Sequence, residues 1–125
     1  MKLIIDGYNL MYKLKPNDPT LEKKRERLIL LLSEFKKINN VDLILVFDGK
    51  FQESGHRGYE TRAGIKIIFS AKEETADDVI IDILRKRKEK PKNYAVVSSD
   101  NKIKDFAYEN NIHIILSEDF LEYLT

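Results

Sequence analysis

The stretch "IIDGYNLMY", residues 4–12, decides how the rest of the chain is interpreted. It begins as an apolar run and changes at Asp6-Gly7-Tyr8-Asn9, where a carboxylate, a glycine and an amide occur within four residues. Two explanations fit this change: a tight turn, in which Gly7 lets the chain leave a sheet, or one corner of a metal site. The positions of the other acidic residues must decide between them.

Short apolar runs rich in β-branched residues recur along the chain, at residues 2–5, 41–47, 65–69, 94–98 and 112–116. Their nearly continuous apolar character is typical of strands that are buried on both faces of a sheet. Helical patterns lie between most of them, over residues 18–40, 75–90 and 101–109, with a short last helix after Ser117. We expect the first helix to start at Asp18-Pro19, the second at a capping box of Thr75 and Asp78, and the last at a Ser117 cap.

Strands that alternate with helices predict an α/β fold of the Rossmann-like kind, with a mainly parallel five-stranded sheet and helices on both faces. A doubly wound strand order such as 3-2-1-4-5 fits this pattern. The second and third strands are joined differently, by residues 48–64, which hold four of the five glycines and few apolar residues. We interpret this linker as a mobile loop of the kind that often carries function.

Composition indicates a single globular domain over residues 1–125, with 42% hydrophobic and 34% charged residues and a net charge of +1. The chain has no cysteine, which excludes disulfides, thiolate metal sites and cysteine nucleophiles. It has no apolar stretch long enough to span a membrane, and Asp6 comes too early for a secretory signal. A cytoplasmic location is therefore the expectation.

Acidic residues follow four of the five predicted strands. Asp6 follows the first, Asp48 the second and Asp100 the fourth, while Asp77 and Asp78 open the helix after the third. Each has an ordinary structural explanation: Asp100 could cap a helix, Asp77 and Asp78 could favour a helix start, and Asp48-Gly49 is a common turn dipeptide. Ligands of open parallel sheets bind outside the carboxyl ends of the strands, however, and all of these acids lie at that edge.

Gathered carboxylates repel one another unless a cation neutralises them, and Mg²⁺ prefers oxygen ligands together with water and phosphate oxygens. Asn9 could orient a water or a phosphate oxygen without adding charge. Other reaction classes fit less well, because no dinucleotide-binding or P-loop glycine pattern occurs. An aspartyl-phosphate enzyme would be expected to have a second acid at position 8, where this chain has Tyr8.

The motifs "IIDGYNLMY", "VFDG", "GIKIIFSAKEETADDVI" and "VVSSDN" resemble, in this order, those of the YacP-like branch of the NYN-domain proteins, in the PIN-like nuclease superfamily. The resemblance covers nearly the whole chain and is most specific in D-G-Y-N and E-T-A-D-D. It implies a PIN-like fold and an endoribonuclease that depends on Mg²⁺ or Mn²⁺ and cuts single-stranded or loosely structured RNA. Carried over by motif, it assigns catalytic roles to Asp6, Asn9, Asp77 and Asp100, and metal ligation to Asp6, Asp77, Asp78, Asp100 and, with a less defined role, Asp48.

The linker offers candidate RNA contacts. Its basic residues Lys50, Arg57 and Arg62 could guide the phosphate backbone, and its aromatic residues Phe51 and Tyr59 could stack on unpaired bases or equally pack on the domain surface. RNA is the expected partner, and a ribosome or another RNA–protein complex stays open as its context.

Two features depart from the resemblance. Many NYN relatives have a further aspartate where this chain has Lys102, and the chain is shorter than is usual for the YacP-like branch. Two alternatives therefore remain beside a ribonuclease: a catalytically weak or inactive PIN-like module that binds RNA or protein, and a PIN-like nuclease that acts on DNA. The second lacks support from any long helical arch that could thread a DNA end.

Overall fold

The structure, a computed structural model, describes residues 1–49, 55–87 and 93–124. Within them, six strands form one sheet in the order β3-β4-β2-β1-β5-β6. The strands are β1 (Lys2–Asp6), β2 (Asp42–Phe47), β3 (Gly58–Arg62), β4 (Ile65–Phe69), β5 (Tyr94–Val97) and β6 (His113–Ile115). β3 runs antiparallel to β4, and every other pairing is parallel.

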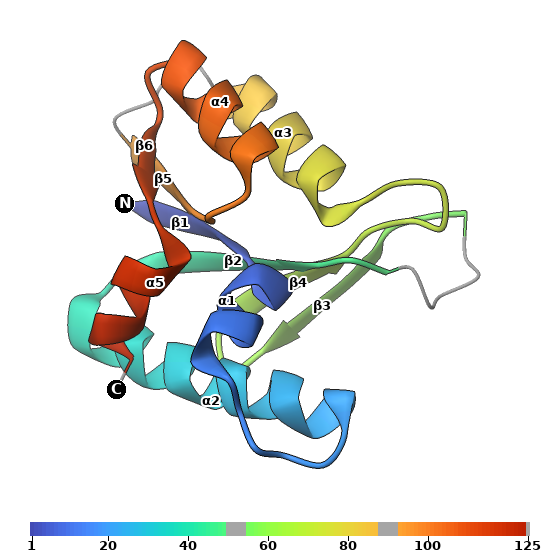
Figure 1. The fold of residues 1–125 in the computed structure, drawn as a ribbon, viewed down its shortest axis with the longest axis vertical. Coiled ribbons are helices and arrows are strands. Elements are labelled where there is room, and N and C mark those ends of the chain that lie inside the picture. Colours follow the sequence, from blue (N-terminus) through green and yellow to red (C-terminus); the bar gives the residue numbers. More distant parts are fainter. Residues whose placement is uncertain (50–54, 88–92, 125) are drawn as a thin grey trace.

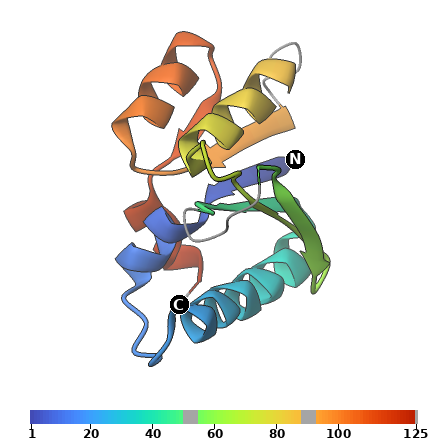
Figure 2. The ribbon, with the colours of Figure 1, turned by 90° about the vertical axis from the view of Figure 1, so that its right-hand side faces the viewer.

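Helices cover both faces of this sheet (Figure 1). They are α1 (Gly7–Leu14), α2 (Leu21–Asn39), α3 (Ala76–Arg87), α4 (Asn101–Glu109) and α5 (Ser117–Phe120), and a 3₁₀ turn follows at Leu121–Tyr123. Figure 2 shows the sheet between two helical layers, with α3 and α4 on one side and α1, α2 and α5 on the other. None of the helices in the described residues is long and apolar enough to cross a membrane.

The apolar strands are buried on both faces because successive side chains point to opposite sides of the sheet. Leu3 and Ile5 of β1 pack into the core formed with α1, α2 and α5. Ile4, between them, packs into the second core, formed with α3 and α4. This arrangement explains the unbroken apolar runs of β1, β2, β4 and β5 and confirms that these are interior strands. β6, predicted in the same way, is instead an edge strand in which His113 is exposed.

The predicted sheet is confirmed for its five main strands, which in chain order are arranged 3-2-1-4-5. The capping box that opens α3 is also confirmed: Thr75 N donates to Asp78 Oδ2 at 2.9 Å, and Asp78 N donates to Thr75 Oγ1 at 3.3 Å. α4 covers the predicted residues 101–109. Asn40 ends α2 in the left-handed conformation, with φ of 49°.

Four local predictions were wrong. The linker is not wholly a loop, because β3 pairs with β4 there. Gly7 opens helix α1 directly after β1 and is not a turn residue. α2 begins later than predicted, since Thr20 is its N-cap and Asp18 binds Arg27 instead. Ser117 is the first residue of α5, where Leu116 precedes it as the cap.

Candidate functional site

Asp6 is the buried member of the acidic edge. It is the last residue of β1 and is 6% exposed, and its Oδ2 accepts a hydrogen bond of 3.0 Å from Ser98 Oγ. The pKa of Asp6 is raised to about 6, mainly by burial and in smaller part by the charges of Asp77 and Asp100, while the hydrogen bond from Ser98 opposes the increase. The neighbouring acids are therefore close enough for their charges to act on Asp6.

Asp77 lies across from Asp6, in the first turn of α3. Partial burial raises the pKa of Asp77, as does the charge of Asp100, while the ammonium of Lys102 opposes the increase. Its neighbour Asp78 differs. Both Asp78 oxygens have other partners, Oδ2 in the capping box and Oδ1 in an ion pair of 3.1 Å with Lys102 Nζ.

Asp100 caps α4, as its ordinary structural explanation predicts. Its Oδ1 accepts from Lys102 N at 2.9 Å and from Ile103 N at 3.2 Å. Its own N–H donates to Ser98 Oγ at 3.0 Å, so that one buried hydroxyl connects Asp100 to Asp6. Capping and a place among the acids are thus compatible at this residue, because its charge still acts on both Asp6 and Asp77.

Asn9, in the first turns of α1, is held in one orientation. Its Oδ1 accepts from Ser99 N at 3.0 Å and from Ser117 Oγ at 2.7 Å. A backbone N–H can only donate, so it fixes which side of the amide is the carbonyl. Ser99 Oγ also donates to Glu118 and accepts from Ser117 N at 3.0 Å. The Asn9 oxygen is thus occupied, and its NH₂ group is the part left to act on a ligand.

These residues surround a pocket of about 300 Å³, called the acidic pocket below, which is lined by Asp6, Tyr8, Asn9, Tyr12, Asp48, Thr75, Ala76 and Asp77. The structure therefore brings together four of the predicted site residues, Asp6, Asn9, Asp48 and Asp77. Asp100 influences the pocket by its charge without lining it, and Asp78 binds Lys102 beside it.

The pocket offers the oxygen donors that a hard divalent cation prefers. Among residues 1–49, 55–87 and 93–124, no three acidic or histidine side chains lie close enough to form a complete protein metal site. Mg²⁺ usually keeps several waters and binds through one or two carboxylates, so this donor set fits an ion that is held partly through water. The raised pKa of Asp6 also fits, because a cation would relieve the repulsion among the acids.

A family model described as the YacP-like NYN domain matches residues 3–125. The chain belongs to this family. Two crystal structures of Rae1 (YacP) from Bacillus subtilis share its fold. A point mutant has a TM-score of 0.80 and 22% identity, covering 98% of this chain and 74% of that chain. The other has a TM-score of 0.75 and 20% identity, covering 99% and 73%. No curated protein matches the chain.

Membership in the YacP-like NYN family supports a nuclease-like function related to RNA. The structure also gives a partner to the lysine that departs from the family pattern. Lys102 places an ammonium group 3.1 Å from Asp78, at the border of the acidic pocket. A positive charge on the chain itself thus lies where a further carboxylate was expected.

The described residues that were predicted to contact RNA do not line the acidic pocket of this YacP-like chain. Arg57 is engaged by two carboxylates: its Nε and Nη2 donate to Glu74 at 2.7 and 3.1 Å, and its Nη1 donates to Asp82 at 3.0 Å. Tyr59 lies with Arg57 in another pocket, on the side of α3. Arg62 pairs with Ile65 at the amino end of β4, at the opposite edge of the sheet from the acids. Lys50 and Phe51 lie outside the described residues.

Sequence reasoning missed two residues beside the acids, Tyr8 and Tyr12, and Arg25, which binds Tyr8. Both tyrosines line the acidic pocket, and Arg25 Nη1 donates to Tyr8 Oη at 2.9 Å. The spacing of Tyr8 and Tyr12 in the opening stretch could have indicated this, because residues four apart share one face of a helix. It could be used only once residues 7–14 were known to be helical.

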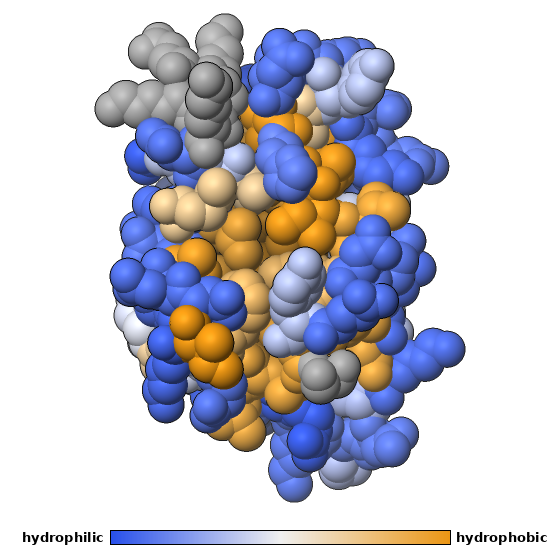
Figure 3. Space-filling view, turned by 90° about the vertical axis from the view of Figure 1, so that its left-hand side faces the viewer, coloured by the Kyte–Doolittle hydropathy of each residue, from blue (hydrophilic) through white to orange (hydrophobic). Residues whose placement is uncertain are grey.

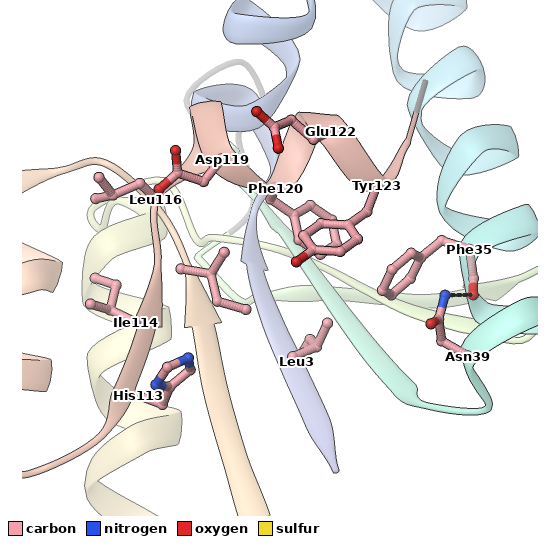
Figure 4. A pocket seen from close by; sticks show the side chains of 11 residues that line it. Leu3, Phe35, Asn39, His113, Ile114, Leu116, Asp119, Phe120, Glu122 and Tyr123 are labelled. Atoms are coloured by element: carbon pink, nitrogen blue, oxygen red, sulfur yellow. Dashed lines mark hydrogen bonds between the residues drawn. The ribbon is translucent and has the colours of Figure 1, made fainter.

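A larger pocket, of about 460 Å³, shares no residue with the acidic pocket. It lies beside the edge strand β6, and Figure 4 shows Leu3, Phe35, Phe120 and Tyr123 around it. Figure 3 shows extensive apolar surface on this face of the molecule. His113 lines this pocket as an exposed residue of β6, away from the acids. The pocket is therefore separate from the candidate site.

Proposed function

We propose that the chain is a metal-dependent endoribonuclease that hydrolyses phosphodiester bonds of single-stranded or loosely structured RNA. The RNA is either free or part of an RNA–protein complex such as the ribosome. The observation that carries the proposal is the buried Asp6, whose pKa is raised by burial and by the charges of Asp77 and Asp100. Carboxylates held this close repel one another, and a bound cation offsets that repulsion.

The cofactor would be Mg²⁺ or Mn²⁺, which activates water and stabilises the leaving oxygen in phosphodiester hydrolysis. Asp6 and Asp77 would hold it together with Asp48, directly or through water, and Asp100 would add negative charge at the border. Asp78 would act as an outer acceptor, since its two oxygens bind Thr75 and Lys102. The NH₂ group of Asn9 would donate a hydrogen bond to a phosphate oxygen or to a water in the pocket.

The test is cleavage of a labelled single-stranded RNA with Mn²⁺, with and without EDTA, by the wild type and by Asp6→Asn, Asp77→Asn and Asp100→Asn. We expect Asp100→Asn to lose about 10–100-fold in rate, as the loss of an outer partner of a metal site does, and Asp6→Asn and Asp77→Asn to lose at least about 100-fold. Asp105→Asn, an exposed acid of α4, is the matched control and should cleave like the wild type. If all variants cleave equally, the activity is a contaminant and the proposal fails.

A second candidate is a binding module without catalysis, and the ion pair between Lys102 and Asp78 favours it. Calorimetric titration with Mn²⁺ separates the two. An enzyme should show a site in the wild type that Asp6→Asn weakens, whereas a pure binding module should show no site that depends on Asp6. Running a DNA oligonucleotide of the same sequence in the cleavage assay tests the third candidate, a nuclease that acts on DNA.

A further inference from the structure

Two tyrosines lie on one face of α1 and stack on each other. Tyr8 and Tyr12 are separated by four residues, and their rings stack with centroids 6.1 Å apart and an interplanar angle of 27°. Tyr12 is 64% exposed, although it is a large aromatic residue on a short helix that packs into the core. One ring is therefore supported from within the molecule while much of the other is presented to solvent.

Tyr8 is fixed on its remaining sides. Its ring lies 4.8 Å from that of Phe47, and its hydroxyl accepts the hydrogen bond from Arg25 Nη1. Arg25 is itself held, since its guanidinium lies 5.9 Å from the ring centroid of Phe69. The stack is thus anchored to β2, β4 and α2, and a rigid aromatic surface loses little conformational entropy when a ligand binds to it.

The position of the stack gives it a specific use. Tyr8 and Tyr12 line the acidic pocket together with Asp6, Asn9, Asp48 and Asp77. In a nucleic acid the base is attached a few bonds from the phosphate, so a phosphate that enters this pocket brings a base to its border. Aromatic rings bind bases by stacking, and they do so with little sequence preference because every base has a flat face.

We propose that Tyr12, supported by Tyr8, is the stacking platform for an unpaired base next to the phosphate that enters the acidic pocket. The inference rests on the proposed function and assigns to two side chains the preference for a strand whose base faces are free. A base inside a duplex has its faces covered by its neighbours and would have to be unstacked first. The platform therefore selects unpaired nucleotides by the availability of their bases.

Another exposed tyrosine provides a matched control. Tyr108 of α4 is 86% exposed and does not line the acidic pocket. Since Tyr108 is at least as exposed as Tyr12, a difference in RNA binding between the two variants must come from position.

The experiment measures by fluorescence anisotropy the affinity for a labelled single-stranded RNA of about 12 nucleotides. Ca²⁺ replaces Mn²⁺ so that binding is measured separately from cleavage. We expect Tyr12→Ala to raise Kd by about 5- to 150-fold, as the loss of one stacked base predicts. Tyr12→Phe keeps the ring and should stay within about twofold of the wild type, as should Tyr108→Ala. Binding to duplex RNA should not respond to Tyr12→Ala.

A fluorescence measurement gives an independent readout. The chain has no tryptophan, so Tyr12→Trp introduces a single reporter at the platform. Single-stranded RNA should quench its emission, whereas an oligonucleotide without bases should leave it unchanged. Thermal unfolding of each variant shows whether the substitutions leave the fold intact, which is expected for an exposed side chain.

Several results would overturn the platform. They are no measurable binding of single-stranded RNA by the wild type, an equal effect of Tyr12→Ala and Tyr108→Ala, or an equal loss of single-stranded and duplex binding. Failure of the proposed function would look different: RNA would bind and depend on Tyr12, yet no cleavage would depend on Asp6. Cleavage that depends on Asp6 but is indifferent to Tyr12 would reject the platform alone.

Discussion

Gly7 illustrates how one residue can be required for a reason other than the obvious one. In the sequence it is typical of a turn, yet the structure places it in helix α1, at a close contact with β2. A Cβ atom at Gly7 would lie 2.5 Å from Phe47 Cδ1 and 2.9 Å from the backbone oxygen of Val46. A ring can move, but the backbone of an interior strand cannot move easily. Glycine is needed here because there is no space for a side chain.

We predict that Gly7→Ala lowers the free energy of unfolding by about 1–3 kcal/mol, as overpacking in a filled core does. The helix propensity of alanine, about 1 kcal/mol better than that of glycine, acts in the opposite direction and is outweighed. The measurement is urea denaturation. Gly55→Ala is the control, because a Cβ there would meet no atom within 4 Å. Equal stability of the two variants would show that the close contact relaxes without cost.

Substitutions of Asn9 can separate the structural role of its oxygen from the proposed role of its NH₂ group in catalysis. Asn9→Ala would leave the donors Ser99 N–H and Ser117 Oγ without their acceptor, and we predict a loss of about 1–3 kcal/mol of stability. Asn9→Asp keeps an accepting oxygen and should lose less, but it replaces the NH₂ group with a carboxylate oxygen. Both variants should cleave RNA more slowly than the wild type. Full activity of Asn9→Asp would show that the NH₂ group does not act on the substrate.

At the scale of elements, the main strands could be predicted because their signal is local. Burial on both faces makes β1, β2, β4 and β5 apolar along their length, and the capping box marks the start of α3. β3 carries no such signal: four of its five residues are exposed, and its pairing comes from β4. α1 was missed because Asp-Gly-Tyr-Asn is typical of a turn. Its helical form is stabilised by packing against core residues distant in sequence.

The hairpin of β3 and β4 turns through Ala63 and Gly64, between the paired residues Arg62 and Ile65. Both turn residues have positive φ, 53° for Ala63 and 77° for Gly64, as a type I′ turn requires. Alanine in this conformation is strained by about 1–2 kcal/mol, whereas asparagine tolerates it. Sequence reasoning could not find the hairpin, because Ala-Gly is not one of the usual type I′ pairs.

We predict that Ala63→Asn stabilises the protein by up to about 1 kcal/mol, because it relieves this strain without changing a contact in the core. The readout is the shift of the urea midpoint at an unchanged m-value. Thr61→Asn, on an exposed position of the same hairpin, should bring no gain, since asparagine is unfavourable within a strand. A gain from both substitutions, or from neither, would contradict the strained turn.

At the scale of the whole molecule, sequence reasoning found the edge of the sheet at which the acids gather but not how each acid is used there. Strand order and parallel direction bring the residues after β1, β2, β4 and β5 to one edge. Side-chain geometry then separates them. Asp6, Asp48 and Asp77 line the pocket, Asp100 caps a helix, and Asp78 binds Lys102. The capping bonds of Asp100 and Asp78 are local and follow from sequence, whereas the contacts of Ser98 with Asp6 and of Lys102 with Asp78 join distant residues, which no local pattern encodes.

The buried Asp6 should leave a signature in the pH dependence of stability. Its pKa is about 6 in the folded protein, against 3.8 for an unperturbed aspartate, so the folded state binds this proton more tightly than the unfolded state. The contribution of Asp6 to stability must therefore fall as pH rises between about 4 and about 6, where this aspartate ionises first in the unfolded chain. The raised pKa corresponds to about 3 kcal/mol of destabilisation that is complete above pH 6.

Other acids contribute more stability as pH rises, because ion pairs and hydrogen bonds lower the pKa values of Glu74, Asp78 and Asp82. The difference in free energy of unfolding between the wild type and Asp6→Asn isolates the contribution of Asp6. Asparagine can still accept the hydrogen bond from Ser98, so the two proteins should be about equally stable near pH 3.5 in EDTA. The variant should become more stable as pH rises to 6, by about 3 kcal/mol.

Divalent ions should make the wild type more stable than Asp6→Asn at neutral pH, the reverse of the order in EDTA. A ligand that binds only the folded state adds RT ln(1 + [L]/Kd), which is about 4.1 kcal/mol at 1,000 times Kd and exceeds the cost of about 3 kcal/mol that the Asp6 charge imposes. Mn²⁺ should therefore stabilise the wild type strongly and Asp6→Asn weakly, while Asp105→Asn follows the wild type. Chemical denaturation over pH 3.5–8 with EDTA or Mn²⁺ measures both effects. If Asp6→Asn is no more stable than the wild type at pH 7 in EDTA, Asp6 is not held as a destabilising charge, and the proposed reason for its burial is lost.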